Sequence, residues 1–538
     1  MSKPFATVLE AGTSLTNKTG SWRTMRPEYI RRLPPCNVTC PAGENIQQWL
    51  AMAQEGRFYE AWQEMVKNNP FPATMGRVCY HTCEKTCNRG QLDGSVNINL
   101  IERSIGDMAI SKGWSFVPVQ KQTGKKVLII GAGPSGLSAA YFLRQMGHEI
   151  TVYESHNLLG GMARYGVPKY RLPRNILDAE IKRILDLGIT VETNKKVESL
   201  QNELGKFDAV YLATGACLAA KTDVEISEDS NTMDAIDLFQ KMEDNPEALP
   251  KLGENVLVYG GGNTAIDAAR TALRLGAKNV KIVYRRTFNK MPAHETEIQD
   301  ALAEGIEVLC LRTITSINNN KVLVAKMEFD EESNTLSKTG DTEMLIADSV
   351  IFAIGQSVED SVVHGVPGIV VSDKGVIEVD SQMMTGAKGV FAGGDVINGK
   401  RTVTHAIGYG KKAAKCINAF LFGQAYTCEP KHEVATFKKL NTEYYKNEAR
   451  EEVSRLGDLS FEEKDVSYGS DQVIFEASRC FSCGNCFHCD NCYSYCPDNA
   501  IIKHEDGSLE INYDYCKGCG ICATECPCGA IKMVADDK

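Results

Sequence analysis

Residues 125–155 read KKVLIIGAGPSGLSAAYFLRQMGHEITVYES and combine an apolar run, a glycine-rich turn, a helical pattern and a second apolar run. This order is typical of a βαβ unit whose first turn binds the pyrophosphate of a dinucleotide. Gly131 permits the tight turn, Gly133 lets the backbone approach a phosphate, and Gly136 lets the helix pack closely on the strand. The stretch therefore predicts a nucleotide-binding α/β domain.

An acidic residue completes this first unit. Glu154 ends the second strand, 21 residues after Gly133, where a carboxylate accepts hydrogen bonds from a ribose hydroxyl. Pro134 and Ser135 lie in the same turn at the helix N-terminus and are further candidate contacts. A glycine turn without a ligand is the alternative, and the joint presence of strand, turn, helix, strand and acid makes it weak.

A second unit of the same kind begins 129 residues further on, as NVLVYGGGNTAIDAARTALRLGAKNVKIVYRR at 255–286. Its second strand ends in two arginines instead of an acid, and guanidinium groups suit a 2′-phosphate, which favours NADP(H) over NAD(H). The alternative, that these arginines only solvate the strand end, stays open. The candidate contacts are Gly260, Gly262, Asn263, Thr264, Ala265, Arg285 and Arg286.

Composition limits the class of protein. The chain has 538 residues, 43% of them hydrophobic, and a net charge of −10, which argues against a nucleic-acid surface as its main partner. The polar start lacks the apolar core of a secretory signal, and no apolar run approaches the roughly 20 residues of a membrane span. We expect a cytoplasmic protein without a membrane span. Of its 20 cysteines, fifteen lie at 36–87 and 480–526, and this clustering indicates thiolates that hold metal.

Two cysteine runs near the C-terminus repeat each other after thirty residues as C-x2-C-x2-C-x3-C-P. In such pairs the fourth cysteine of each run ligates the other [4Fe–4S] cluster, and two full runs are far more specific for iron–sulfur clusters than for the alternative, zinc. The pattern predicts a first ferredoxin set, Cys486, Cys489, Cys492 and Cys526, and a second ferredoxin set, Cys496, Cys516, Cys519 and Cys522.

Taken together, GAGPSG with its acid, LLGGMARYGVPKYRLPR, LATG, GGGNTAIDAA with YRR, and FAGGD resemble the glutamate synthase small (beta) subunit family, which includes the N-terminal half of dihydropyrimidine dehydrogenase. The resemblance covers about residues 30–425. It implies an α/β fold with two Rossmann-like, thioredoxin-reductase-like domains, the first holding FAD and the second NADP(H). Its further implied contacts are Gly161, Arg171, Gly394, Asp395 and Thr402 for FAD, and Gly355 for NAD(P).

The expected domains follow from these motifs. They are a helical N-terminal Fe–S domain (1–120), a discontinuous FAD-binding domain (121–228 and 353–426), an NAD(P)-binding domain (229–352), a helical linker (427–479) and a bacterial ferredoxin-like α+β domain (480–538). No C-x2-C occurs between 255 and 352, so electrons do not leave the flavin through a thioredoxin-reductase disulfide.

The family's N-terminal domain holds two further [4Fe–4S] clusters, and here its usual RCxxC pair is missing from the N-terminus. It reappears at 479–483, just ahead of the ferredoxin run. The simplest account is a shared set, Cys36, Cys87, Cys480 and Cys483, and a second N-terminal set, Cys40, Cys79, Cys83 and Glu102. A shortened gap leaves the pairing of Cys83 and Cys87 open, and two spare thiols are the alternative for the RCxxC pair.

The remaining cysteines and three histidines are interpreted as structural because isolated thiols are most often small buried hydrophobes. These residues are Cys217, Cys310, Cys416, Cys428, Cys528, His294, His405 and His488.

The expected function is that of an electron-transfer flavoprotein subunit between NAD(P)(H) and a redox partner, such as a soluble ferredoxin or a subunit of a 2-oxoacid:acceptor oxidoreductase. FAD, NADP(H) and four clusters are the expected cofactors, and no catalytic side chain is assigned because the cofactors carry the chemistry. The alternatives are a flavin-based bifurcating transhydrogenase subunit, an NADPH-oxidising subunit of a glutamate-synthase-like enzyme, a self-contained reductase and a redox-sensing scaffold.

Overall fold

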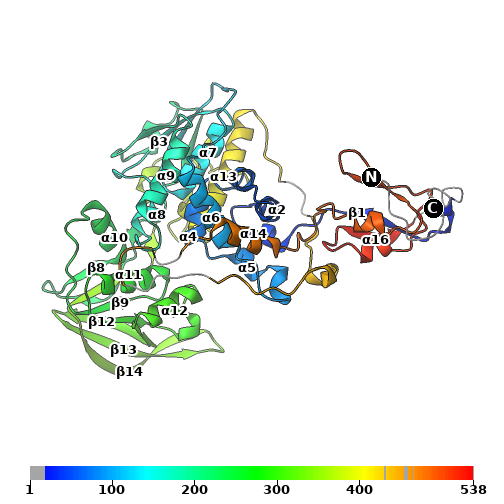
Figure 1. Cartoon of the computed structure of the whole chain (residues 1–538). Helices are drawn as coiled ribbons and strands as arrows, with labels where there is room; N and C mark the ends of the chain where they lie inside the picture. Colours follow the sequence, from blue (N-terminus) through cyan, green and yellow to red (C-terminus); the bar gives the residue numbers. More distant parts are fainter. Residues whose placement is uncertain (1–17, 429–431, 453–458, 464–465, 537–538) are drawn as a thin grey trace.

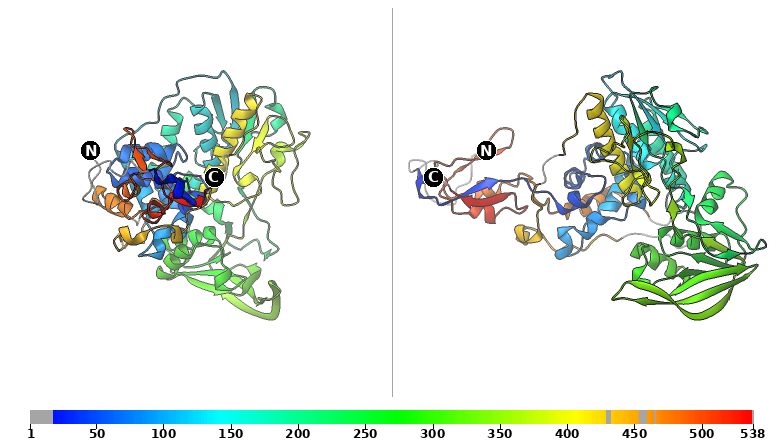
Figure 2. Two further views of the ribbon diagram at one scale, coloured as in Figure 1. Left: turned by 90° about the vertical axis from the view of Figure 1, so that its right-hand side faces the viewer. Right: turned by 180° about the vertical axis from the view of Figure 1, so that it is seen from behind.

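The computed structural model describes residues 18–428, 432–452, 459–463 and 466–536. Two α/β lobes and a group of short helices form the large part of the molecule, and a small domain stands apart from it (Figures 1 and 2). The strand nearest the start of the described chain and the last strand both lie in this small domain.

The first lobe is built on one five-stranded parallel sheet. Its buried apolar strands are typical of a parallel sheet covered on both faces, and α7 (Pro134–Gln145) and α13 (Val403–Leu421) pack together against it. In spatial order the strands are β17 (Val390–Ala392), β5 (Ala209–Leu212), β2 (Lys126–Ile130), β3 (Glu149–Tyr153) and β4 (Thr190–Glu192). The short helices α8 (Met162–Tyr165) and α9 (Arg174–Leu185) connect β3 to β4.

The second lobe interrupts the first, since β5 and β17 pair in one sheet although the whole second lobe lies between them in the sequence. The two crossings lie side by side as β6 (Leu218–Ala219) and β16 (Gln356–Ser357). The parallel sheet of this lobe comprises, in order, β11 (Glu307–Cys310), β10 (Asn279–Tyr284), β9 (Asn255–Tyr259), β15 (Ser349–Phe352) and β8 (Thr232–Asp234).

Three helices and a second sheet complete this lobe. The helices are α10 (Ala235–Asp244), α11 (Asn263–Arg274) and α12 (Glu295–Ala303). The second sheet comprises β14 (Thr335–Ile346), β13 (Lys321–Asp330), β12 (Arg312–Asn318) and β7 (Glu225–Ile226).

Short helices form the N-terminal Fe–S domain, as the sequence predicts. Two of them begin at prolines, which have no N–H to leave unpaired at the first helical position. They are α1 (Pro35–Thr39), α2 (Ile46–Gln54), α3 (Phe58–Val66), α4 (Pro72–Val78), α5 (Thr82–Lys85) and α6 (Ile98–Ser111). Glu180 of α9 joins them to the first lobe by accepting hydrogen bonds from the N–H groups of Ala73 and Thr74 (both 2.8 Å).

The small domain is the expected ferredoxin-like domain, but it includes an N-terminal strand that the sequence analysis assigned elsewhere. β1 (Met25–Tyr29) pairs antiparallel with β20 (Ile531–Ala535). Among the described residues β20 has no other strand partner, so β1 completes this two-stranded sheet and residues 18–29 do not belong with the helices. The remaining elements are α15 (Asn491–Ser494), β18 (Ile501–Lys503), β19 (Leu509–Ile511) and α16 (Ile521–Thr524).

The expectation of a helical linker over 427–479 is wrong for most of the described residues. Only two 3₁₀ turns, Phe437–Lys439 and Thr442–Tyr444, precede α14 (Ser470–Ser478). The extended backbone bonds instead to distant parts of the chain: Leu33 donates to the carbonyl of Glu433 (2.8 Å), and Ala435 donates to that of Leu33 (3.0 Å). These tertiary bonds outweigh local helix preference. Residues 429–431, 453–458 and 464–465 of this segment lie outside the described residues.

Helices long and apolar enough to cross a bilayer were sought throughout the described residues, and none meets both conditions.

A tight crossing of α4 and α6 generates the first prediction. A Cβ at Gly76 would lie 2.3 Å from the Cα of Arg103. Alanine normally stabilises a helix relative to glycine, but here it forces the helices apart, so we expect Gly76→Ala to lower the free energy of unfolding by about 1–3 kcal/mol. Urea unfolding followed by the fluorescence of the buried Trp49 and Trp62 measures it. Gly90→Ala, whose Cβ would lie 3.8 Å from the nearest atom, the backbone N of Ser95, is the control, and equal effects of both changes would contradict the packing argument.

Candidate functional site

The glycine turn after β2 opens a cavity of about 360 Å³ in the first lobe. Gly131 has φ +104°, and a Cβ at Gly136 would lie 1.9 Å from the carbonyl oxygen of Gly131, so both positions require glycine. All predicted FAD contacts except Gly136 line this cavity, and Gly136 instead packs α7 against the turn. The lining contacts are Gly131, Gly133, Pro134, Ser135, Glu154, Gly161, Arg171, Gly394, Asp395 and Thr402.

Glu154 is buried at the end of β3 and holds the turn in place. Its Oε2 accepts a hydrogen bond from the N–H of Ala132 (2.8 Å), and its Oε1 accepts one from the N–H of His156 (2.9 Å). The carboxylate predicted to bind a ribose therefore also fixes the backbone that faces the phosphates.

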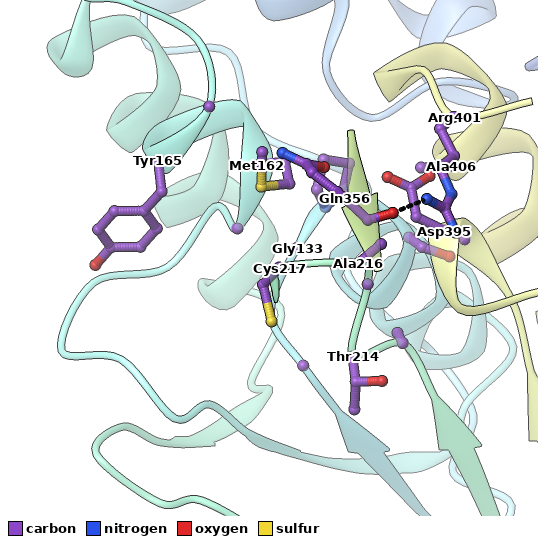
Figure 3. Close-up of a pocket in the computed structure, with 18 of the residues that line it drawn as sticks. Gly133, Met162, Tyr165, Thr214, Ala216, Cys217, Gln356, Asp395, Arg401 and Ala406 are labelled. Carbon is purple, nitrogen blue, oxygen red and sulfur yellow. Dashed lines mark hydrogen bonds between the residues drawn. The ribbon is translucent and has the colours of Figure 1, made fainter. Parts of the chain in front are cut away.

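A polar cluster that the sequence analysis missed lies on another wall of the cavity (Figure 3). Arg401 donates a hydrogen bond to the carbonyl of Gln356 (2.8 Å) and lies close to Asp395. Burial raises the pKa of Asp395 to about 6, and the positive charge of Arg401 opposes this shift. The position of Arg401 directly before Thr402 was the available signal in the sequence.

Arg171 links the two lobes beside the same cavity. Its guanidinium forms ion pairs with Asp267 of α11 (2.7 Å) and Glu297 of α12 (2.9 Å). Burial raises the pKa of Asp267 to about 6, while the charge of Arg171 lowers it. Sequence analysis named the arginine, but it did not find its two acidic partners because they are distant in sequence.

A second cavity, of about 950 Å³, lies in the second lobe. Gly260, with φ +149°, turns the chain at the end of β9, and Arg285 and Arg286 are exposed at the end of β10. Six predicted contacts line this cavity: Gly260, Gly262, Thr264, Arg285, Arg286 and Gly355.

The other two predicted contacts of this unit lie elsewhere. Asn263 lines the first cavity and accepts a hydrogen bond from the N–H of His294 (2.8 Å), whereas Ala265 is buried within α11. Lys221 and Lys338, which the sequence analysis did not single out, add positive charge to the second cavity.

Cysteines from both ends of the chain surround one small cavity between the helical domain and the loop after α14. All four members of the shared set, Cys36, Cys87, Cys480 and Cys483, line it, whereas Cys83 does not. Burial raises the pKa of Cys36, and negative charges on the other three thiols raise it further. Buried thiolates in this number need a cationic centre, so the donor set fits an iron–sulfur cluster.

The second N-terminal set lies beside the first-lobe cavity. Val78 and Tyr80, the neighbours of Cys79, line that cavity. Glu102 is buried on α6 and accepts a hydrogen bond from Asn69 (2.8 Å). Burial raises the pKa of Glu102, and charges on Glu44 and Cys79 raise it further.

Glu44 is a second buried carboxylate at this place that the sequence analysis missed. It accepts hydrogen bonds from Asn69 (2.9 Å) and from the indole of Trp49 (3.2 Å). Burial raises the pKa of Cys40, with the charges of Glu44 and then Glu102 contributing. Two carboxylates thus lie near the three thiols, and both are oxygen donors for iron.

The ferredoxin cysteines interleave as the spacing predicts. The second ferredoxin set, Cys496, Cys516, Cys519 and Cys522, lines one cavity, although Cys496 comes from the first run. In the first ferredoxin set, burial raises the pKa of Cys486, Cys489 and Cys492, and the charge of Cys526 from the second run acts on all three.

The cysteine sets differ from a site for a single metal ion. Within the described ranges, no group of three or more His, Cys, Asp or Glu side chains is arranged to hold one metal ion. A four-iron cubane keeps its thiolates farther apart than one ion does, so the cavities that the cysteine sets surround are the relevant geometry.

A buried ion network supports the shared set, and it was not found from the sequence. The side chain of Arg479 is fully buried and pairs with Glu476 (2.6 Å) and Asp93 (3.1 Å). Arg89 also pairs with Asp93, donates to the carbonyl of Arg479 (3.1 Å) and lies over the ring of Phe481. The network thereby fixes the backbone on either side of Cys480.

Comparison with known proteins agrees with this geometry. Three family profiles match: pyridine nucleotide-disulphide oxidoreductase at 125–410, dihydropyrimidine dehydrogenase domain II with its 4Fe-4S cluster at 30–114, and a 4Fe-4S dicluster domain at 485–530. Two dinucleotide-binding lobes joined to iron–sulfur domains define the class of pyridine-nucleotide-dependent flavin and iron–sulfur oxidoreductases.

Within that class, the chain belongs to the pyridine nucleotide-disulphide oxidoreductase family. The resemblance to the glutamate synthase small subunit is confirmed: the chain is 34% identical to the NADPH-dependent small chain from Azospirillum brasilense, covering 73% of this chain and 87% of that one.

Two further relatives are subunits of other enzymes. The NADP(+)-dependent formate dehydrogenase subunit beta of Moorella thermoacetica is 36% identical over 72% of this chain and 60% of its own length. The NADPH-Fe(3+) oxidoreductase subunit beta of Geobacter sulfurreducens is 32% identical over 84% of this chain and 75% of its own length. The chain therefore spans less than two thirds of the formate dehydrogenase subunit.

The buried network generates the second prediction. Arg479→Met leaves Glu476 buried without its ion-pair partner and removes one of the two arginines that pair with Asp93, so we expect the free energy of unfolding to fall by about 3–5 kcal/mol. Urea unfolding monitored by tryptophan fluorescence measures this change, since α14 packs on α2, which carries Trp49. Lys182→Met removes the exposed pair with Asp186 (2.8 Å) and is the control, with no measurable change expected. Similar losses in both variants would contradict a special role of the buried network.

Proposed function

We propose that this chain is an electron-transfer subunit that connects NADP(H) to a redox partner through FAD and four [4Fe–4S] clusters. The observation that carries the proposal is the shared set, in which cysteines from the two ends of the chain surround one cavity. When bound, FAD exchanges a hydride with the nicotinamide and single electrons with the clusters, which carry one electron at a time.

The first-lobe cavity supports a role in binding FAD. Helix α7 directs its N-terminus towards the turn, where the backbone N–H groups suit a pyrophosphate, and Glu154 stands at the ribose end. Asn263, Thr264 and Asp267 of the second lobe line the same cavity. A nicotinamide bound by the second lobe would therefore meet the flavin where the lobes join, beside Tyr80 and Met162.

The second cavity supports a preference for NADP(H). Arg285 and Arg286 are exposed at the end of β10 and line this cavity, where their guanidinium groups suit a 2′-phosphate. The names of three relatives point the same way, since each refers to NADP(+) or NADPH.

The four cysteine sets follow one another from the flavin cavity outward. Cys79 lies between two residues of the cavity wall, and the charge of Cys36 acts on Cys83, which connects the two N-terminal sets. Only Gly484 and Asn485 separate Cys483 of the shared set from Cys486 of the first ferredoxin set.

The last step lies within the ferredoxin domain. The charge of Cys492 acts on Cys522, which connects the first and second ferredoxin sets, and Cys519 is exposed at the outer end. We therefore place partner docking at the second ferredoxin set. The partner is a redox subunit or a soluble ferredoxin, and a reducing cytoplasm suits the thiolates.

The third prediction tests the path. In the doubly substituted variant Cys480→Ser, Cys483→Ser we expect the iron content to fall from about 16 to about 12 atoms per chain. NADPH should still bleach the flavin anaerobically, while reduction of a viologen dye falls strongly, because the path is broken beyond the second N-terminal set.

Cys416→Ser, at a buried cysteine outside all four sets, is the matched control and should retain full iron and full dye reduction. Unchanged iron in the double variant would end the shared-set assignment. A wild-type protein that bleaches with NADPH yet reduces no one-electron acceptor would end the proposed function.

The fourth prediction tests the nucleotide preference. Arg285→Ala, Arg286→Ala removes charge-assisted hydrogen bonds worth about 1.5–3 kcal/mol each, so we expect the Kd for NADPH to rise at least about tenfold. Binding of NADH should change little. Lys290→Ala, in the 3₁₀ turn Phe288–Lys290 outside the cavity, is the control. Equal weakening of both nucleotides would show that the arginines do not recognise the 2′-phosphate.

A further inference from the structure

The N-terminal strand β1 lies against both ferredoxin cysteine sets. Its residues pair with β20, so that Pro27 faces Met533 and Tyr29 faces the buried Ile531. Because alternate residues of a strand share a face, Pro27 and Tyr29 point the same way. Pro27 lines the cavity of the second ferredoxin set, and the hydroxyl of Tyr29 lies 3.4 Å from Sγ of Cys492 in the first.

When Cys492 is a metal ligand, only one direction is possible for the hydrogen bond between it and Tyr29. A metal-bound cysteine is a thiolate and has no proton to give, so the tyrosine hydroxyl is the donor. Burial is the largest cause that raises the pKa of Tyr29, and the hydrogen bond with Cys492 and the charges of nearby thiols raise it further. The phenol therefore keeps its proton at any physiological pH.

Other contacts to the ferredoxin sulfurs come from groups of a different kind. Backbone N–H groups donate to two ferredoxin thiols, that of Ala530 to Cys526 (3.3 Å) and that of Ala500 to Cys496 (3.2 Å). Among the described residues, Tyr29 is the side-chain hydroxyl that reaches a ferredoxin cysteine. It also comes from a segment more than 460 residues away in sequence.

We propose that Tyr29 donates a hydrogen bond to the Cys492 thiolate and thereby raises the reduction potential of the cluster held by the first ferredoxin set. Hydrogen bonds to cluster sulfurs withdraw negative charge and stabilise the reduced, more negative cluster. The inference rests on the proposed function, because it assumes that this set holds a cluster. Tyr29 acts through its ligand and is a positioning residue.

The position of this cluster gives the hydrogen bond its significance. The first ferredoxin set lies between the shared set and the second ferredoxin set, so every electron that enters or leaves through the ferredoxin domain passes it. A more positive potential there makes the cluster easier to reduce from either neighbour. The N-terminal strand thus sets the potential of a cluster in the middle of the path while it pairs with β20.

The test is an anaerobic redox titration of Tyr29→Phe followed by low-temperature EPR. We expect one cluster signal to move to a more negative potential, with the reduced-to-oxidised ratio at fixed potential falling about three- to tenfold, which is roughly 30–60 mV. The other signals and the iron content should stay unchanged. Tyr513→Phe, which removes a hydroxyl that donates to the carbonyl of Pro27 (2.8 Å), is the control and should move none.

The outcomes separate this inference from the proposed function. Full iron with no shift in Tyr29→Phe, or an equal shift in Tyr513→Phe, overturns the inference alone. A wild-type protein well short of about 16 iron atoms overturns the proposed function itself. If Tyr29→Phe does not assemble its clusters, wild-type protein labelled with 3-fluorotyrosine decides: its more acidic hydroxyl should move one potential in the positive direction, and no movement overturns the inference.

Discussion

The burial of four thiols from opposite ends of the chain in one place is the constraint on which the rest of the structure depends. Burial and then the charges of the other three thiols raise the pKa of Cys36, so thiolates held together here are unfavourable unless a cationic centre lies between them. Cys36 and Cys480 are separated by more than 400 residues, so this site forms only when both ends of the chain have come together. A cluster bound there would therefore couple metal binding to folding.

Several features of the chain follow from that convergence. The buried pairs of Arg479 with Glu476 and Asp93 hold the backbone next to Cys480, so the ligand loop is fixed by charge as well as by its thiols. Cys36 lines the cavity of the shared set from the N-terminal part of the chain, and it follows Tyr29 of β1 by only seven residues. The same two stretches of chain thus supply the shared set and continue directly into the ferredoxin domain, which leaves little freedom between them.

Local patterns predicted the parts of the fold whose contacts are local. The strands, turns and helices around Gly131 and Gly260, and the interleaved ferredoxin cysteines, follow from spacing alone because each unit satisfies its own backbone bonds. The resemblance to a family predicted the second N-terminal set, and the count of available ligands predicted the shared set. The strand β1 was missed because MRPEY is short, contains a proline and pairs only with a partner 500 residues away.

The acidic partners of Arg171 and the second carboxylate Glu44 were missed for the same reason. Nothing near Glu44 or Asp267 in the sequence marks them as buried, and both acquire their role only from side chains of other elements. Glu102, which the resemblance assigned as a ligand, is buried near Cys79, and the structure places a second carboxylate, Glu44, beside it.

The extended conformation of the linker allows contacts with several domains that a helix could not make. Asn441 bonds to Pro527 and Thr524 of the ferredoxin domain, and Ser460 accepts a hydrogen bond from Arg274 of the second lobe. Glu463 then pairs with Arg77 and Arg103 of the helical domain. An extended strand leaves its own polar groups unpaired and must satisfy them on its neighbours, so a single segment can bond to every domain in turn. A helix satisfies those groups internally and spans less than half the distance per residue. The linker therefore ties the lobes and the cysteine sets together along the path on which electron transfer requires fixed separations.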